Sequence, residues 1–299
     1  MSDVFPYFGD VDLPIQAELD SDLDIAFSAM PHKTSVDVVP LLLEQGIKVI
    51  DVSADFRLKD AGEYPKWYSF THPFPQLLEE AVYGLPELHR EEIISARLVA
   101  NPGCYSTAAI LALAPVVKQG LIYEDVIIDS KSGVSGAGRT LSLTSHYSEA
   151  NENAYAYSVE GHRHLSEVEQ ELKLLNTQFS PSITFVPHLI PMTRGILTTC
   201  YARLKEGFND RDELNQLYND FYEQAPFVRV TSKPPPTKHA WGNNFCLIYP
   251  AIDLRTKRLI AISCLDNLVK GGAGQAIQNM NLMFNLPETS GLETLAVYP

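Results

Sequence analysis

The chain has 299 residues, which is enough for two domains with ordinary hydrophobic cores or for one large domain. With 45% hydrophobic and 20% charged residues, it has the composition of a soluble globular protein. The net charge of −14 argues against nucleic acid or an anionic membrane as a partner, so an anionic substrate needs a local cationic pocket. No apolar run reaches the length of a membrane helix and the first residues lack a secretory signal pattern, so we expect a cytoplasmic protein.

Strands and helices alternate in the first part of the sequence. A strand is predicted over residues 24–29, a helix over 36–45 that stops at Gly46, and a second strand over 47–51. This β-α-β order is typical of a parallel, doubly wound sheet, in which ligands bind beyond the carboxyl ends of the strands. Three loops are expected at those ends: residues 30–33, residues 52–57 and the turn before Cys104.

The run NPGC at residues 101–104 separates a predicted buried strand over 96–100 from a predicted helix over 108–117. A proline and a glycine make the turn, so Cys104 falls at or just before the start of the helix. Unpaired N–H groups and the positive end of the helix dipole lower the pKa of a thiol there, and the thiolate is the reactive form. We interpret Cys104 as a candidate nucleophile; the alternative is a small buried thiol that fills a gap in the core.

The other three cysteines, Cys200, Cys246 and Cys264, lie inside strand-like runs. None of the four forms a C-x-x-C pair, so neither a zinc site nor a dithiol redox site is predicted. We expect these three to be inert thiols of the core.

The organisation changes after the Cys104 helix. Two helices are predicted there, over residues 166–175 and 210–222, and a third over 275–284 that opens at the glycines of 271–274. Several strands interrupted by helices favour an α+β domain on a mixed or antiparallel sheet. The predicted strands cover residues 126–132, 183–187, 195–204, 227–231, 245–252 and 259–265.

The run GHRH at residues 161–164 precedes a helix for which Ser166 and Glu169 form a plausible capping box. Its side chains, His162, Arg163 and His164, suit an anionic substrate, and a thiolate needs a proton-transfer partner. The alternatives are a solvated loop with incidental histidines and a metal pair. The spacing offers no helical face and no third ligand, so no metal site is predicted.

Taken together, these motifs resemble the N-acetyl-gamma-glutamyl-phosphate reductases, the arginine-pathway members of the semialdehyde dehydrogenase group. The run NPGCY at residues 101–105 is similar to the active-site signature of that family. Further similar stretches, which extend the likeness from about residue 22 to the C-terminus, are DVSADFR at 51–57, YGLPEL at 83–88, KSGVSGAGR at 131–139, GHRH at 161–164, PHLIPMTRGIL at 187–197 and NLVKGGAGQAIQ at 267–278.

The resemblance implies an α/β fold with a Rossmann-like parallel sheet over residues 1–103, to which 268–299 return, and an α+β catalytic and dimerisation domain over 104–267. Only Gly9 precedes Gly46, so no Gly-rich phosphate-binding turn is possible there. The family's first nucleotide-binding elements would precede residue 1, and we expect an N-terminally incomplete sheet. Either an upstream part is lost, or the natural protein is short with an impaired cofactor site; the intact later motifs favour the first explanation.

Roles of individual residues follow from the resemblance. The general acid and base is expected to be His164 first and His162 second, beside the nucleophile Cys104. Without the family motifs around them, the basic side chains among these candidates would be interpreted as surface charges, and Asn267 as a loop residue. His188 is expected to be structural. The implied substrate contacts are Asn101, Lys131, Arg139, Arg163 and Arg194. The implied cofactor contacts are Ser28, Pro31, His32, Ser132, Gly133, Gly136 and Asn267.

The implied reaction is the NADPH-dependent reductive dephosphorylation of N-acetyl-glutamyl 5-phosphate to its semialdehyde. Cys104 forms a thioester, phosphate leaves, and hydride from NADPH reduces the thioester carbonyl. NADP(H), a small anionic substrate with phosphate, and a homodimer or homotetramer are the partners that the resemblance implies. The alternatives are reduction of another acyl phosphate (aspartyl or carrier-linked aminoadipyl), Cys–His acyl transfer or hydrolysis, and a subunit without catalysis.

Overall fold

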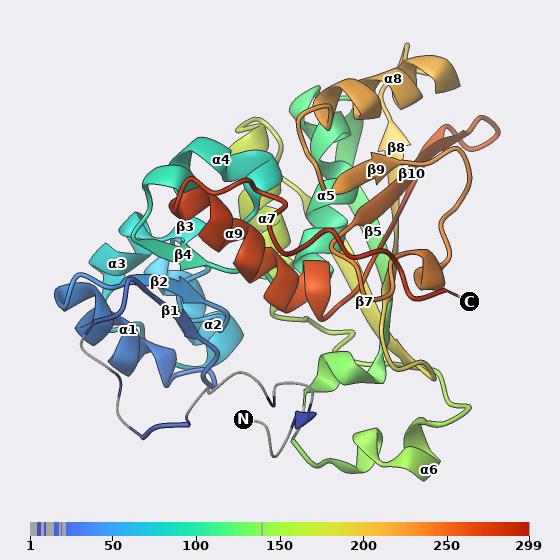
Figure 1. The fold of residues 1–299 in the computed structure, drawn as a ribbon. Coiled ribbons are helices and arrows are strands. Elements are labelled where there is room, and N and C mark those ends of the chain that lie inside the picture. Colours follow the sequence, from blue (N-terminus) through green and yellow to red (C-terminus); the bar gives the residue numbers. More distant parts are fainter. Residues whose placement is uncertain are drawn as a thin grey trace.

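The computed structural model describes residues 5–6, 9, 15–17, 19, 22–138 and 140–298. Two sheets organise these residues, a small one built from the first part of the chain and a large one built from the rest (Figure 1). The small sheet is ordered β1-β2-β4-β3 and every pairing in it is parallel, which confirms the predicted doubly wound sheet. Its strands are β1 (Ile25–Ser28), β2 (Lys48–Asp51), β3 (Val82–Tyr83) and β4 (Leu98–Ala100).

Helices connect the strands of the small sheet. The first, α1 (Ser35–Glu44), runs from β1 to β2 and is followed by Gly46, whose φ of 81° only glycine adopts without strain. Between β2 and β4 the chain forms short helical elements before and after β3. They are η2 (Ala61–Glu63), α2 (Tyr64–Tyr68), α3 (Pro75–Glu80) and α4 (Pro86–Ser95).

The large sheet is mixed, as predicted, with the order β6-β7-β5-β8-β11-β10-β9. Its central strands β5, β8, β11 and β10 pair antiparallel, whereas β7 and β9 add parallel strands on either side. The strands are β5 (Ile122–Gly133), β6 (Tyr155–Ala156), β7 (Ser182–Ile190), β8 (Ile196–Leu204), β9 (Val228–Val230), β10 (Cys246–Asp253) and β11 (Arg258–Leu265). Cys200, Cys246 and Cys264 are buried free thiols in these strands, as expected.

Helix α5 (Cys104–Lys118) packs on one face of the large sheet, together with α7 (His164–Leu175) and α8 (Arg211–Phe221) (Figure 1). Every residue of α5 from Tyr105 to Val117 is buried, and its alanines let sheet and helices approach closely. Each buried methylene in such a core contributes about 0.8 kcal/mol. The first residue of α5 therefore belongs to the most deeply buried of the described helices.

The predicted capping box of α7 is wrong. The helix begins at His164 rather than after Ser166, with Arg163 in the N-cap position and no side-chain cap. The turn closes early because the Leu165 N–H already donates to the His162 carbonyl. Ser166 instead donates its hydroxyl to the Arg163 carbonyl, 2.7 Å away. This earlier start brings His164 to the helix terminus.

After the large sheet, the chain passes back to the small one. The π-helical η6 (Val269–Ala273) leads into α9 (Gly274–Met283), which packs against α4 and β2 (Figure 1). The remaining short helices, η3 (Val134–Ala137), η4 (Leu143–Ser145), α6 (Tyr147–Ala150) and η5 (Thr237–His239), lie in connections. Within the described ranges, no helix is long and apolar enough to cross a membrane.

Candidate active site

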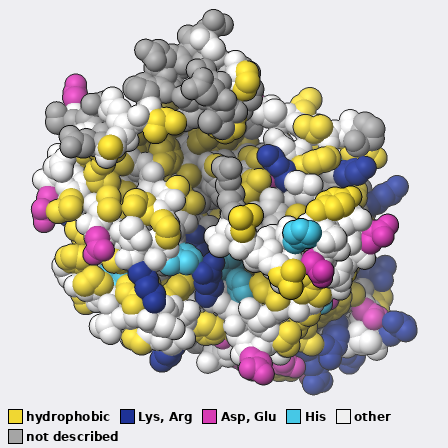
Figure 2. All heavy atoms as spheres, turned by 90° about the horizontal axis from the view of Figure 1, so that it is seen from below, with side chains coloured by type: hydrophobic (Ala, Val, Ile, Leu, Met, Phe, Trp, Pro, Cys, Tyr) yellow, Lys and Arg dark blue, Asp and Glu magenta, His cyan; other side chains and the backbone are white. Residues whose placement is uncertain are grey.

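A cleft of about 870 Å³ lies at the carboxyl ends of β1, β2 and β4, where parallel sheets bind ligands. In the space-filling view, histidine side chains and side chains of the Lys and Arg colour lie around the hollow between the two halves of the molecule (Figure 2). Those that line the cleft are His32, His164, Arg57 and Arg163. The lining includes all three predicted loops, with Pro31, His32, Ser53, Arg57, Gly103 and Cys104, and it adds Gly136, Arg163, His164, Asn267 and Gly271 from later segments.

Cys104 is the first residue of α5 and Gly103 is its N-cap, as the sequence predicts. The pKa of the Cys104 thiol is raised, whereas the sequence predicts a lowered pKa at a helix N-terminus. Burial raises the pKa of Cys104 to about 11, although the N–H groups of Tyr105 and Cys104 and the charge of Arg57 act to lower it. Enclosure of the thiol outweighs the helix terminus. The thiol is therefore protonated at neutral pH and needs a base.

The predicted base, His164, lies beside this turn. Its ring is buried and lies against the Cys104 turn, since a Cβ on Gly103 would be 2.6 Å from His164 Nε2. Burial, reinforced by His162, Arg57 and Arg163, holds the pKa of His164 well below its usual value. The imidazole is neutral, and its Nδ1 has no hydrogen-bond partner among the described residues.

His162 lies beside His164, with the two ring centroids 4.6 Å apart. Its Nδ1 accepts the His164 N–H at 3.2 Å, so the neutral ring carries its proton on Nε2. Burial and then Arg163 lower the pKa of His162 to about 4. Among the described residues, no three His, Cys, Asp or Glu side chains converge as a metal site requires.

Two buried charges support the turn, and neither was among the predicted site residues. Glu167 Oε2 accepts the Gly103 N–H at 2.9 Å, and its Oε1 accepts Arg57 Nη1 at 3.0 Å. Arg57 also donates to the carbonyls of Val52 and Asn101. Arg57 is the last residue of the family-like run at 51–57 and could have been considered for that reason, and Glu167 is on the same face of α7 as His164, three residues on. No local sequence pattern indicates that Arg57 and Glu167 would meet.

The predicted cofactor contacts divide into two groups. Pro31, His32, Gly136 and Asn267 line the cleft. Asn267 accepts the Gly195 N–H through Oδ1 and donates one N–H to Ser135, which leaves its second N–H free among the described residues. The residues of the second group do not line the cleft and contact other parts of the chain instead.

That second group comprises Ser28, Ser132 and Gly133. Ser28 is buried, with its Oγ 2.5 Å from Ser35 Oγ in a chain that continues to Asp51. The Ser132 hydroxyl donates to the Gly133 carbonyl. A side chain at Gly133 would meet the Thr193 backbone at 2.7 Å, so this glycine allows β5 to approach the 193–195 segment.

The predicted substrate contacts are dispersed. Arg163 lines the cleft, is exposed and has no ion-pair partner in the described part of the chain.

Lys131 pairs with Asp129 at 2.7 Å, and Arg194 Nη1 lies 3.7 Å from Asp266. Asn101 is buried and donates to the Gly272 carbonyl. Neither Lys131, Arg194 nor Asn101 lines the cleft, and Arg139 falls outside the described residues. His188, expected to be structural, has its Nδ1 3.2 Å from Asp129.

Comparison with known proteins agrees with this architecture. Two family models match, the NAD binding domain of semialdehyde dehydrogenases over residues 5–96 and their dimerisation domain over 104–267. Aspartate semialdehyde dehydrogenase II from Vibrio cholerae has a similar fold, with a TM-score of 0.67 at 18% identity over 90% of this chain and 82% of that one. The Candida albicans aspartate semialdehyde dehydrogenase, solved with NADP, has a TM-score of 0.61 at 13% identity, over 87% and 77%.

Curated relatives are much closer in sequence. The N-acetyl-gamma-glutamyl-phosphate reductase of Dehalococcoides mccartyi is 55% identical over all 299 residues, which cover 87% of its length. That of Heliobacterium modesticaldum is 50% identical over the whole chain and 88% of its own length.

The fold, with a cysteine at a helix N-terminus in a cleft between two sheets, and the two domain matches define a semialdehyde dehydrogenase. Within that class, the chain belongs to the N-acetyl-gamma-glutamyl-phosphate reductase family, because relatives of that name are about half identical over its full length. The resemblance seen in the sequence is thereby confirmed.

Proposed function

We propose that this chain reduces N-acetyl-glutamyl 5-phosphate to N-acetyl-glutamate 5-semialdehyde with NADPH, in arginine biosynthesis. One observation carries the chemistry: the Cys104 turn packs against a buried, neutral His164 at the edge of a cleft that the cofactor-side loops also line. A protonated thiol beside an unprotonated imidazole is the pair that nucleophilic catalysis on an acyl group requires.

The residues present fit a nicotinamide ring. Gly136 lines the cleft, and because a Cβ there would lie 2.8 Å from Ser132 Oγ, the bare backbone lets this segment pack closely on β5. Pro31 and His32 from the β1 loop and the free N–H of Asn267 would hold the dinucleotide. When bound, the nicotinamide supplies the hydride. The choice of NADP over NAD follows from the family resemblance.

The chain's own residues account for the remaining steps. His164 takes the proton of Cys104 and the sulfur attacks the acyl carbon; the bond from that carbon to the phosphate oxygen then breaks, which releases phosphate and leaves a thioester on Cys104. After reduction, the thiohemiacetal on Cys104 releases the aldehyde, and His164 moves the proton. The Gly103 N–H is held by Glu167, so the oxyanion donors left at this turn are the N–H groups of Cys104 and Tyr105. Arg163, a cation of the cleft that has no ion-pair partner among the described residues, binds the phosphate.

The test is phosphate-dependent reduction of NADP with N-acetyl-glutamate semialdehyde as substrate. Cys104→Ser is expected to lower kcat at least about a thousandfold, because the nucleophile is lost. Cys264→Ser, a change of the same kind in β11, is expected to keep activity within about threefold, as a thiol outside the cleft. Folded wild-type protein without turnover would overturn the proposal, and faster turnover of aspartate semialdehyde would favour the related acyl phosphate.

We also propose a homodimer formed through the open face of the large sheet. Helices α5, α7 and α8 cover one face, whereas the other presents a cross-strand row of Ile127, Tyr201, Ile260 and Ala251. Ile127 is 36% exposed in the single chain. An apolar sheet face of this kind is stabilised by a second copy. The match of residues 104–267 to a dimerisation domain supports this assembly.

The expected domain boundaries remain part of the proposal. They assign residues 1–103 and 268–299 to the nucleotide domain, and 104–267 to the catalytic domain. The packing of α9 on α4 and β2 supports the return of the C-terminal segment to the small sheet.

A further inference from the structure

A cavity of about 640 Å³ lies at the end of the large sheet that is remote from Cys104. Its walls are the segment after β8 and the hairpin that joins β10 to β11. The Lys205 N–H donates to the Leu121 carbonyl, just beyond the last residue of α5. Because α5 has 15 residues and rises about 1.5 Å per residue, the cavity is about 22 Å from its first residue and is separate from the cleft.

Basic side chains gather around this cavity. Arg203, Lys205 and Lys257 line it, and Arg258 lies directly opposite Arg203 in the pairing of β8 with β11. All four are exposed, and none has an ion-pair partner within the described residues. Like charges that face each other across two strands repel. Acidic residues outnumber basic ones in this chain, 37 to 23, so four neighbouring cations without an acid partner require an explanation.

The acids near the cavity do not neutralise these cations. Asp253 lies opposite Arg258 in the pairing of β10 with β11, but its carboxylate accepts the Arg255 N–H at 3.0 Å and Arg255 Nη2 at 3.2 Å. Glu206 lines the cavity and has no ion-pair partner in the part of the chain that the structure describes. One unpaired carboxylate thus stands among four cations, and the remaining positive charge attracts an anion.

Aromatic and apolar side chains form the rest of the wall. The guanidinium of Arg203 lies over the Tyr123 ring, with Cζ 5.5 Å from the ring centroid, and this contact orients the planar group while its N–H groups stay available. Phe208 and Leu254, which is 53% exposed, add apolar surface. Arginine binds phosphate through two parallel N–H groups, and lysine adds a point charge. The wall therefore suits a phosphate group that carries an apolar or aromatic part.

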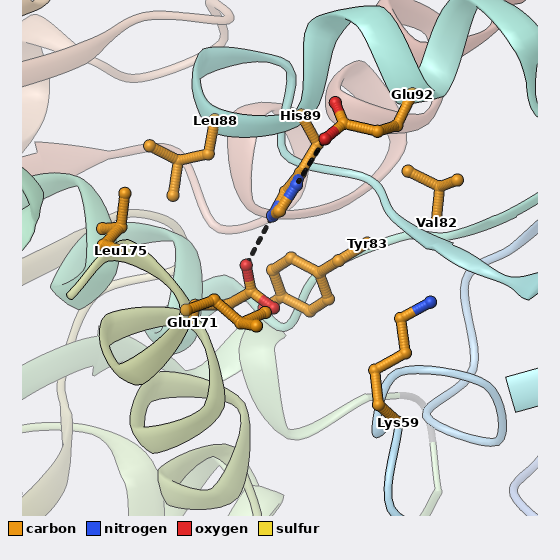
Figure 3. A pocket seen from close by; sticks show the side chains of 9 residues that line it. Lys59, Val82, Tyr83, Leu88, His89, Glu92, Glu171 and Leu175 are labelled. Carbon is orange, nitrogen blue, oxygen red and sulfur yellow. Dashed lines mark hydrogen bonds and ion pairs between the residues drawn. The ribbon is translucent and has the colours of Figure 1, made fainter. Parts of the chain in front are cut away.

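Figure 3 shows a different pocket, in which the charged side chains are already paired. His89 and Glu171 point toward one another there, with Nε2 and Oε2 2.6 Å apart, and they join α4 to α7. Lys59 of the same pocket donates to the carbonyls of Glu79 and Ala81. The charges of that pocket hold parts of the fold together, whereas the cations at the end of the large sheet have no such task.

We propose that the cavity at the end of the large sheet is a second binding site, which takes a phosphorylated small molecule of the nucleoside phosphate class. Its phosphates bind to Arg203, Lys205 and Lys257, and its apolar part contacts Phe208 and Leu254. The site is remote from Cys104, so it does not rest on the proposed reductase activity and can be tested by binding alone.

The test is isothermal titration calorimetry of the full chain with ATP as the probe. Wild type is expected to bind with a Kd below about 1 mM. Arg203→Gln/Lys205→Gln is expected to weaken binding at least about tenfold, because charge-assisted contacts to phosphate are lost. One control, Lys173→Gln/Lys238→Gln, removes the same charge from exposed positions elsewhere, and a second, Arg163→Gln, removes a cation of the cleft. Both are expected to bind within about twofold of wild type.

Three results of this titration would overturn the proposal. The first is a wild-type chain that does not bind ATP. The second is equal weakening in Lys173→Gln/Lys238→Gln, which would show attraction by the overall charge. The third is weakening confined to Arg163→Gln, which would place the probe in the cleft. A wild-type chain that binds ATP in the cavity but shows no reductase turnover would count against the proposed function alone.

Inorganic triphosphate tests the apolar part of the wall. It carries at least the charge of ATP but has no base or sugar to contact Phe208 and Leu254. We therefore expect it to bind at least about fivefold more weakly than ATP in the same titration. Equal or tighter binding of inorganic triphosphate would overturn the assignment to the nucleoside phosphate class.

An acidic segment of a second copy is the other candidate occupant of these cations, because Arg203 is on the same face of β8 as Tyr201. Analytical ultracentrifugation tests it on Arg203→Gln/Lys205→Gln. We expect this variant to assemble like wild type, since its cations bind a small molecule. A weaker assembly would show that they pair with acids of a second copy, and would overturn the proposal.

Discussion

At Cys104, burial and the helix N-terminus act on the thiol in opposite directions. Burial prevails and raises its pKa to about 11, while the pKa of His164 is held well below the usual value. The resting pair is therefore neutral. In the proposed reaction, proton transfer from sulfur to imidazole then accompanies attack on the substrate rather than preceding it.

Replacement of the base tests this pairing. His164→Asn is expected to lower kcat by about a hundredfold or more, because the protonated thiol loses its proton acceptor. His239→Asn, a change at an exposed histidine outside the cleft, is expected to leave kcat unchanged within about twofold. Steady-state kinetics at neutral pH distinguishes the two. Comparable activity of both variants would assign the proton transfer to another group.

The low pKa of His162 makes folding stability depend on pH. The unfolded chain protonates this histidine near pH 6.5, whereas the folded chain binds the proton only at about 4, so the free energy of unfolding falls as pH drops between these values. His162→Asn keeps an acceptor for the His164 N–H and is expected to reduce the slope by about one proton. Burial raises the pKa of Asp51, which acts in the opposite direction but equally in both proteins.

Urea unfolding at about pH 7 and about pH 5 measures this difference. A variant that loses as much stability as wild type over the interval would show that His162 is protonated in the folded chain.

At the scale of elements, the start of α5 is enclosed by two glycines from different segments. Gly103 lies against the His164 ring, and Gly271 of η6 lies against Cys104 itself, since a Cβ there would be 2.7 Å from Cys104 Cβ. The helix terminus is thus held between α7 and η6. Bare backbone is required at both positions because the His164 ring at Gly103 and the Cys104 side chain at Gly271 leave no room for a Cβ.

Gly271→Ala should displace the nucleophile without removing any reacting group. The added methyl has to push Cys104 or η6 aside, so we expect kcat to fall at least about tenfold, because small displacements of reacting atoms are costly. The control is Gly62→Ala in η2, where the nearest atom, 3.1 Å away, belongs to the flexible Asp60 side chain. Kinetics together with thermal melting separates displacement from unfolding. An active Gly271→Ala variant would contradict the packing described.

At the scale of the whole molecule, the large sheet has helices on one face and an open apolar row on the other. Ile127→Asp in the middle of that row is expected to convert the dimer to monomer, because a charge in an apolar contact is not compensated. The matched change Leu41→Asp, on the exposed side of α1, is expected to leave the dimer intact. Analytical ultracentrifugation measures whether each variant is a dimer or a monomer. A monomeric wild-type chain would overturn the proposed assembly.

Much of this molecule follows from local sequence. The strand and helix patterns, the stop at Gly46 and the position of Cys104 at the start of α5 depend on neighbouring residues, and apart from one helix start they agree with the structure. The start of α7 was predicted too late, because one backbone contact at His162 replaced the expected side-chain cap. Lys131 and Arg194 could not be placed relative to the cleft, since the direction of a basic side chain depends on the acid that it meets.

The sequence by itself determined the class of fold, the family and the position of Cys104 at the start of a helix, because these rest on periodicity and on contiguous motifs. Only the tertiary structure decided the protonation of the thiol and the supports of its turn. The charges that act on Cys104 belong to Arg57 and Glu167, and Glu167 also accepts the Tyr83 hydroxyl. These residues are far apart in the chain and meet only when α7 docks beside the ends of β2, β3 and β4.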